Sequence, residues 1–248
     1  ARNDALVFVS EAVRKEHDFE AHAGESRVVY NGVEDPRGVE ALEPYSREYR
    51  SELGIPRDAL VIGCIAEFVG WKNHAVLVRA FAKLVQTHPE ARLLLIGDGE
   101  LREATVALAG ELGVGDKVVA TGRRVDARKL LGLMDIYAHP ANGEGFGLAV
   151  AEAMLCGRPA VVARAGALPE LTRHMENGLL VEPDDADALA AALVRLADSP
   201  ALRAELGAEA RAACLERFSP SSYAMRLTEV LLAEHDRVEC AEAAVAAP

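Results

Sequence analysis

The sequence lacks any apolar run that is long enough to cross a membrane. A transmembrane helix needs about 18 or more consecutive apolar residues, and no stretch of this chain reaches that length. The first residues also lack the charged and then apolar pattern of a signal peptide. We therefore expect a globular protein in the cytoplasm. Peripheral contact with the inner membrane face through a further domain is the alternative.

Basic residues are in the minority, because 27 Lys and Arg face 39 Asp and Glu and give a net charge of −12. Proteins that bind nucleic acid or anionic membranes prefer a basic surface, so both functions are disfavoured. The 4 cysteines form no CxxC pair, which favours free thiols in a reducing compartment. The 7 histidines show no HxxxH or HExxH spacing. We therefore predict no metal site and no bound cofactor.

Short apolar runs alternate with helical patterns along most of the chain. Strands that alternate with helical segments of about 10–15 residues indicate a doubly wound (Rossmann-like) α/β fold, with a parallel sheet covered on both faces. The strands are predicted at residues 6–9, 28–30, 60–66, 93–96, 117–120, 136–138 and 160–162. Three Ala- and Leu-rich helices are predicted after the last strand. In this fold, ligands bind beyond the carboxyl ends of the strands.

The most informative segment is the run of residues 142–154, which is typical of a Gly-rich turn that opens into a helix. Gly145 and Gly147 let backbone N–H groups approach a ligand closely. The helix that follows directs free N–H groups and the positive end of its dipole at the same point, which favours an anion. Glu144 and Glu152 suit hydroxyl groups instead. A nucleotide sugar carries both phosphate and hydroxyl groups, so the pattern favours it as the ligand.

The spacing of Glu144 and Glu152 around a Gly-Phe-Gly-Leu turn resembles the signature of the group 1 (family 4) retaining glycosyltransferases, which have the GT-B fold. Other segments resemble that family in the same order along the chain. They are residues 28–33, 94–99, 121–123, 153–154, 156–159, 166 and 168–170. The resemblance spans about residues 1–233 and implies the C-terminal, donor-binding half of a GT-B enzyme.

The resemblance also implies a division of the chain into three parts. Residues 1–26 would be a remnant of the N-terminal acceptor domain, and residues 27–234 the nucleotide-sugar-binding Rossmann-like domain. Residues 235–248, nearly all Ala, Val, Glu and Pro after the first few, are expected to form a disordered tail. Because the family places its acceptor site in the N-terminal domain, we expect that domain to be supplied in cis or in trans.

The function that the resemblance implies is transfer of a sugar from a nucleoside-diphosphate sugar to a hydroxyl acceptor, as in glycan or polysaccharide synthesis. The acceptor would be a glycan, a lipid-linked compound or a small molecule. Glu144 would orient the sugar, and Glu152 would bind the ribose. Lys72 would neutralise the diphosphate without a metal ion, because a fixed cation stabilises the charge that the leaving nucleotide gains. The other assigned ligand contacts are Gly122 and Arg123 for the base, and the main chain of Gly145, Phe146, Gly147 and Leu148 for the diphosphate and sugar.

Glu67 departs from the family pattern, which usually has an arginine five residues before the lysine. A carboxylate about 4 Å from a phosphate charge is repelled by about 4 kcal/mol at an effective dielectric constant of about 20. A helix N-terminus stabilises a negative charge by only ~0.3–2 kcal/mol, which does not offset this repulsion. Four alternatives stay open. Glu67 pairs with Lys72, accepts a hydroxyl group of the sugar, or turns away while Arg123 or Arg124 supplies the charge. The fourth alternative is reduced activity.

Two other functions also stay open. A non-catalytic module or subunit that binds a nucleotide sugar agrees with Glu67 and with the missing acceptor half. A GT-B epimerase that acts on a nucleotide sugar is a third interpretation, and the spacing of Glu144 and Glu152 argues against it.

Overall fold

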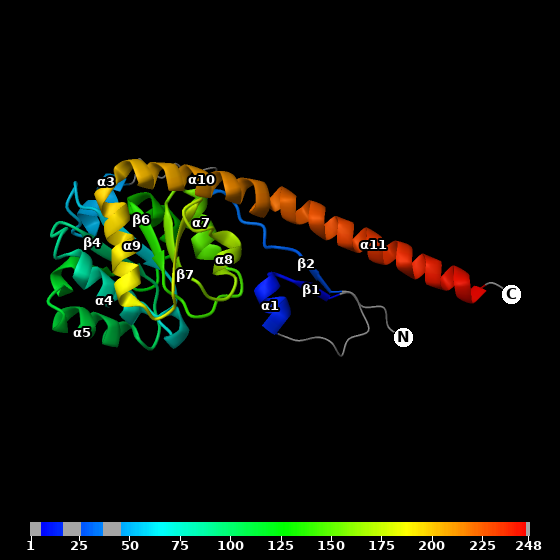
Figure 1. Ribbon diagram of the computed structural model, residues 1–248, viewed down its shortest axis with the longest axis horizontal. Helices are drawn as coiled ribbons and strands as arrows, with labels where there is room; N and C mark the ends of the chain where they lie inside the picture. Colours follow the sequence, from blue (N-terminus) through cyan, green and yellow to red (C-terminus); the bar gives the residue numbers. More distant parts are fainter. Residues whose placement is uncertain (1–5, 17–25, 37–45, 247–248) are drawn as a thin grey trace.

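The computed structural model describes residues 6–16, 26–36 and 46–246, and a six-stranded parallel sheet forms its centre (Figure 1). The strand order is β5-β4-β3-β6-β7-β8, and every neighbouring pair is parallel. The strands are β3 (Val61–Ile65), β4 (Arg92–Ile96), β5 (Val118–Ala120), β6 (Ile136–His139), β7 (Ala160–Ala163) and β8 (Gly178–Val181). Helices cover both faces of this sheet, which confirms the doubly wound α/β fold.

The helices divide between the two faces. One face carries α4 (His74–Leu84), α5 (Arg102–Glu111) and α9 (Ala186–Asp198), and the other carries α7 (Leu148–Leu155) and α10 (Pro200–Phe218). The shorter elements are α3 (Ser46–Glu52), α6 (Ala127–Leu130), α8 (Leu168–Leu171) and the 3₁₀ turns η2 (Gly70–Lys72), η3 (Gly115–Lys117) and η4 (Leu131–Leu133). Within the ranges that the structure describes, no helix has an apolar stretch that could span a bilayer.

Strand β4, which lies next to the edge strand β5, shows why residues 93–96 form a continuous apolar run. Alternate side chains of a strand point to opposite faces of the sheet. Leu93 and Leu95 therefore belong to the buried cluster under α4 and α9, whereas Leu94 and Ile96 belong to the cluster under α7 and α10. Because both faces are covered, each of these four positions must be apolar. The five strands expected between residues 60 and 162 are found with their ends shifted by at most one residue.

The strand β8 at the edge of the sheet was not predicted from the sequence. It pairs with β7 along its whole length, from Ala160 opposite Gly178 to Ala163 opposite Val181. Its sequence, Gly-Leu-Leu-Val, has a single β-branched residue, and such a short apolar run suits a buried helix equally well. Pairing with β7 decides the outcome, and it is a tertiary contact that no local pattern shows.

Two strands near the N-terminus form a separate parallel sheet, β1 (Leu6–Phe8) and β2 (Ser26–Val28), with α1 (Glu11–Glu16) after β1. The strand expected at residues 28–30 is therefore shifted, and β2 crosses the expected domain boundary at residues 26 and 27. The apolar character of Val29 and Tyr30 reflects packing in the core and not a longer strand. Val29 is buried, and the ring of Tyr30 meets that of Phe218 edge-on at 5.4 Å.

The carboxylate of Glu170 links α1 and Tyr30 to the part of the chain that carries the six-stranded sheet. Glu170 of α8 accepts hydrogen bonds from the backbone N–H groups of Glu11 (3.0 Å) and Ala12 (2.8 Å), which begin α1. The hydroxyl group of Tyr30 donates a third hydrogen bond to Glu170, at 2.9 Å. A negative charge at a helix N-terminus is favourable, so these contacts hold α1 against the loops that carry the candidate site.

The expected tail at residues 235–248 is helical over most of its length. Helix α11 (Pro220–Ala246) continues through it and extends away from the six-stranded sheet (Figure 1). The prediction of a disordered tail is therefore wrong up to Ala246. Ala and Glu, which dominate this segment, are among the residues that favour helix most strongly, and no glycine or proline interrupts it before Pro248.

Candidate active site

The candidate site lies beyond the carboxyl ends of β3 and β6. The strand order runs outward in opposite directions from these two central strands, and such a reversal opens a crevice above the sheet. Lys72 ends the 3₁₀ turn η2 that follows β3, and His139 is the last residue of β6. Glu144 lies in the loop between β6 and α7. The topology therefore brings together three polar side chains from two segments of the chain.

The Glu144 carboxylate is the centre of this cluster. Its Oε2 atom lies 2.5 Å from Nζ of Lys72 and 2.9 Å from Nε2 of His139. The side chains of Lys72, Glu144 and His139 are only 16%, 15% and 2% exposed, so little water reaches these contacts. Within the described residues, the other carboxylate oxygen, Oε1, makes no hydrogen bond. The arrangement fixes the carboxylate and leaves one oxygen to accept a further donor.

The protonation states in the cluster follow from burial and from these contacts. Burial alone raises the pKa of Glu144, but the hydrogen bonds from His139 and Lys72 outweigh it and bring the pKa to about 2. Burial lowers the pKa of His139, so the ring is neutral at pH 7. Since a carboxylate only accepts hydrogen bonds, Nε2 of His139 carries the proton. Glu144 is thus a permanent hydrogen-bond acceptor at neutral pH.

Lys72 lies just before the long helix α4 and is not part of it. The turn η2 ends at Lys72, and α4 begins two residues later at His74. Between them, Asn73 has a left-handed backbone conformation with φ of 58°, which separates the turn from the helix. His74 is buried and stacks on the ring of Phe68 at 4.0 Å, so its role is structural. Lys72 therefore points at Glu144 from a turn.

The Gly-rich turn leaves the N-terminus of α7 without a side-chain cap, as the motif predicts. We call this helix end, at Gly147 and Leu148, the mouth of α7. Gly147 is the N-cap of α7 with φ of 97°, a conformation that L side chains rarely adopt, and no side chain caps the helix. A cavity of 330 Å³ lies at this mouth. It is lined by Lys72, His139, Glu144 and the turn residues 145–149. The side chain of Phe146 is 4% exposed and packs in the core.

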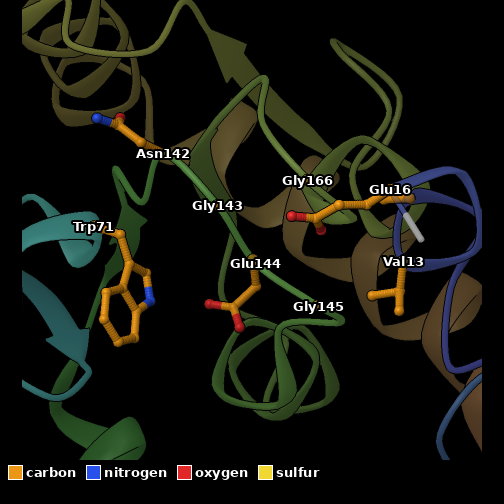
Figure 2. A pocket seen from close by; sticks show the side chains of 9 residues that line it. Val13, Glu16, Trp71, Asn142, Gly143, Glu144, Gly145 and Gly166 are labelled. Carbon is orange, nitrogen blue, oxygen red and sulfur yellow. The ribbon is translucent and has the colours of Figure 1, made fainter. Parts of the chain in front are cut away.

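A second cavity, of 530 Å³, also borders Glu144 (Figure 2). Trp71 lines it from η2, and Val13 and Glu16 line it from α1. Glu144 and Gly145 border both cavities, so the two spaces are neighbours. No sequence pattern had indicated Trp71 or Glu16 as part of the site.

The main chain of Glu144 is held from behind by the loop after β7. Ala167 N–H donates to the carbonyl oxygen of Glu144 at 2.8 Å. Gly166 adopts φ of 52°, and a Cβ atom there would lie 2.5 Å from both the N and O atoms of Glu144. Only glycine permits this close approach. The segment around Gly166 that resembles the family thus supports Glu144.

Glu152, the second carboxylate of the motif, does not join the cluster around Glu144. It is 9% exposed, and its Oε1 atom lies 2.7 Å from both Nε and Nη2 of Arg128 in α6. Burial raises the pKa of Glu152, and Arg128 acts in the opposite direction. Arg128 was not predicted, and its spacing from Glu152 gives no local signal. The contact of Glu152 with ribose stays a prediction.

The loop expected to hold the base contains one buried and two charged residues. Gly122 is buried with φ of 74°, and its carbonyl oxygen accepts from Gly97 N–H at 3.0 Å. Arg123 is exposed beside it. Arg124 contacts Asp126 at 2.8 Å and Glu52 at 2.6 Å, so its charge is already paired.

These positions narrow the alternatives for Glu67. Its side chain is exposed, and within the described residues it forms no ion pair. Lys72 pairs with Glu144 instead, so the first alternative, a Glu67–Lys72 pair, is not found. Arg124 is paired with Glu52 and Asp126. If Glu67 turns away from the diphosphate, Arg123 is therefore the arginine of this loop that remains to supply the positive charge. Contact with a sugar hydroxyl and reduced activity stay open.

Comparisons with known proteins agree with this architecture. Residues 46–213 match the sequence model of the family described as glycosyl transferases group 1. N-acetyl-alpha-D-glucosaminyl L-malate synthase of Bacillus anthracis is 30% identical over 88% of this chain and 56% of its own length. D-inositol 3-phosphate glycosyltransferase of Saccharomonospora viridis is 35% identical over 78% of this chain and 47% of its own length.

A solved structure is similar over almost the whole chain. HepE from Anabaena, crystallised with UDP and glucose, matches with a TM-score of 0.82 and 27% identity. The match covers 92% of this chain and 62% of HepE. The chain thus spans between 47% and 62% of the length of these three proteins. The matched segment covers most of the six-stranded sheet and the Glu144 cluster, and the chain belongs to the group 1 glycosyltransferase family, with the α/β architecture of one half of the GT-B fold.

Proposed function

We propose that this chain binds the donor in a retaining glycosyltransferase, which transfers a sugar from a nucleoside-diphosphate sugar to a hydroxyl acceptor. The observation that carries the proposal is the cluster of Lys72, His139 and Glu144 at the uncapped mouth of α7. HepE, which was also crystallised with UDP-glucose, supports this type of donor. The acceptor is a glycan, a lipid-linked compound or a small molecule, and the acceptor domain is supplied in cis or in trans.

The diphosphate would lie in the 330 Å³ cavity at the helix mouth. Free N–H groups at the start of α7, around Gly147 and Leu148, suit its oxygens. The ammonium group of Lys72 would lie between the diphosphate and the Glu144 carboxylate and would separate two negative charges. As the glycosidic bond breaks, the leaving nucleotide gains charge, and a fixed cation then stabilises the transition state more than the ground state. Lys72 thus takes the part that a metal ion plays in other transferases, and no cofactor is needed.

Glu144 would orient the transferred sugar. Its carboxylate stays ionised because its pKa is about 2, so it accepts hydrogen bonds from hydroxyl groups and cannot serve as a proton donor at pH 7. Retention of the anomeric configuration would then follow from attack of the acceptor on the face that the nucleotide leaves. The departing phosphate takes the proton of the acceptor, and no side chain of this chain acts as a nucleophile.

The ribose and the base would extend from the helix mouth toward Glu152, Gly122 and Arg123. For Glu152 to accept the ribose hydroxyls, the carboxylate must share or release its contact with Arg128. Arg128 is 56% exposed, so it can turn into solvent at little cost. Ribose would then replace a surface arginine as the partner of a buried carboxylate.

Calorimetric titration with UDP-, GDP- and ADP-sugars tests this proposal. The donor should bind the wild-type chain, and Lys72→Ala and Glu152→Ala should each lower its affinity at least about tenfold, or 1.4 kcal/mol. Lys83→Ala is the matched control, because Lys83 forms an exposed ion pair with Asp187 away from the crevice. Unchanged affinity in both site variants would remove the assignment.

A second candidate function is a binding module that holds a nucleotide sugar without turnover. Glu67, at the position where the family usually has an arginine, favours it. Incubation of the chain with a panel of nucleotide sugars separates the two functions. Hydrolysis or transfer by the chain itself would reject the binding module.

A further inference from the structure

The chain has a single tryptophan, and its side chain lies exposed in the larger cavity. Trp71 is 55% exposed, although a buried indole would remove a large apolar area from water. It lines the 530 Å³ cavity next to Glu144 and across from α1. Exposed aromatic side chains in a concave site of this size are typical of ligand-binding surfaces.

The backbone that carries Trp71 is fixed to two neighbouring loops. The carbonyl oxygen of Trp71 accepts from Asn142 N–H at 2.8 Å. The side-chain amide of Asn73 donates to Asn142 Oδ1 at 3.1 Å and to Asp184 Oδ1 at 2.8 Å, and Asn142 Nδ2 donates to the same aspartate oxygen at 2.9 Å. The backbone that carries the indole is therefore held in place. A ligand that stacks on a side chain with a fixed backbone loses less free energy to ordering than one that must also order the backbone.

The opposite wall of the cavity comes from the N-terminal part of the chain. Figure 2 shows Trp71 on one side, Val13 and Glu16 on the other, and Glu144 between them. The cavity thus combines apolar surfaces on both sides with two carboxylates that accept hydrogen bonds. A six-membered polyol ring has matching chemistry, because its C–H face suits an aromatic ring and its hydroxyl groups donate to carboxylates.

The charges in the cavity favour a neutral ligand. The negative charge of Glu144 is balanced by Lys72. Glu16 is exposed, and within the described residues it forms no ion pair, since Arg14 of the same helix pairs with Glu11. An additional phosphate or carboxylate on the ligand would therefore meet the uncompensated charge of Glu16 in a partly enclosed space and be repelled.

We propose that this cavity is an acceptor subsite for an uncharged six-membered polyol ring, a pyranoside or a cyclitol, that stacks on Trp71 and donates hydroxyl hydrogen bonds to Glu16. The subsite rests on the proposed function, because Glu144 borders both cavities and places the ring beside the donor sugar. It deepens that function by naming the class of acceptor. It also separates this chain from a relative named for D-inositol 3-phosphate, an anionic compound.

The fluorescence of the chain tests the proposal directly, since all tryptophan emission comes from Trp71. The 248-residue chain, saturated with UDP, would be titrated with methyl α-D-glucopyranoside and myo-inositol. The charged probes would be D-inositol 3-phosphate and L-malate. At least one neutral ring should shift the emission with a dissociation constant in the millimolar range, and the charged probes should bind at least about tenfold more weakly. Equal responses to inositol and its phosphate, or none to any ring, would overturn the proposal.

Two variants exclude a non-specific effect. Glu16→Gln should narrow the preference for inositol over inositol 3-phosphate to less than about threefold, because it removes the repelling charge. Trp71→Ala, followed by saturation-transfer NMR, should weaken binding of the neutral ring about fivefold or more, and Trp71→Phe should restore part of it. Leu101→Ala, which shortens another exposed apolar side chain, is the control. An unchanged preference in Glu16→Gln would overturn the assignment of Glu16.

UDP affinity, measured by calorimetry on the same samples, separates the failure of this proposal from that of the proposed function. If UDP binds but no neutral ring perturbs Trp71, the acceptor subsite is wrong and the donor site stands. If UDP, GDP and ADP all fail to bind, the proposed function itself fails, and the subsite with it.

Discussion

Glu144 and Glu152 belong to one motif, yet the fold gives them opposite surroundings. Glu144 has two nearly buried partners, Lys72 and His139, and its pKa falls to about 2. Glu152 has Arg128, which is 56% exposed, and burial raises its pKa. The first carboxylate is thus held in its charged form, and the second is buried at a cost with a partner that can leave. We infer that the partners of Glu144 stay in place when a ligand binds. Glu152, in contrast, can exchange Arg128 for a hydrogen-bond donor of the ligand.

The largest expected effect separates the two carboxylates by stability. Glu144→Gln removes the charge that Lys72 and His139 contact, and it should lower the free energy of unfolding by about 2–3 kcal/mol at pH 7. Glu152→Gln should cost only about 0–1 kcal/mol, because the fold disfavours the charged form of Glu152. Urea denaturation measures both, with the exposed Glu90→Gln as control. Equal losses in the two site variants would contradict the contrast.

The pH dependence of stability sharpens the same comparison, and its sign differs between the residues. The pKa of Glu144 lies near 2 in the folded state and near 4.5 when unperturbed, so its contribution is present above pH 4.5 and is lost as the pH falls toward 2. The raised pKa of Glu152 means that its folded form binds protons more tightly, so stability decreases as the pH rises through that pKa. Denaturation series between acid and neutral pH should therefore show a shallower rise in Glu144→Gln and a smaller loss in Glu152→Gln. Parallel curves for both variants and the wild type would refute these assignments.

A third prediction concerns the partner that replaces Arg128. If ribose takes that place, UDP should bind about tenfold more tightly than its 2′-deoxy form, because the buried carboxylate keeps a hydrogen bond from the 2′-hydroxyl. In Glu152→Gln this ratio should fall close to one, whereas in Glu144→Gln it should persist. Calorimetry with the two nucleotides decides the matter. A ratio that survives in Glu152→Gln places the ribose elsewhere.

The sequence indicated which strand ends carry the polar cluster, but not all the side chains that make contact there. Lys72 and Glu144 each follow a strand of the parallel sheet, and strand ends of this kind meet at one edge, so their proximity could be predicted. His139 could not be assigned, because a single histidine in an apolar strand gives no sign that a loop will return a carboxylate to it. Arg128 was missed for the same reason, since its contact with Glu152 joins segments 24 residues apart.

The fold shows the same limit. Strands with strong apolar patterns were predicted to within one residue, whereas β8 depends on pairing with β7 and was missed. The strand at residues 28–30 was displaced because Tyr30 turns to pack against Phe218. Patterns along the chain report burial and local propensity, and contacts between distant segments decide where an element ends.

The smallest expected effect concerns Glu67, which is exposed at the edge of the site that Lys72 occupies. Glu67→Arg restores the charge that the family usually has there and should raise UDP affinity about two- to fivefold, or about 0.5–1 kcal/mol, because solvent screens an exposed charge. The gain should shrink with added salt, since screening shortens the range of the interaction. Glu90→Arg makes the same change in net charge at another exposed position, so it separates a local effect from a general one. An equal gain in UDP affinity in Glu90→Arg, or no gain in Glu67→Arg, would contradict this prediction. Glu67 would then lie too far from the diphosphate to affect it, and Lys72 and the N-terminus of α7 would hold the donor without a contribution from that position.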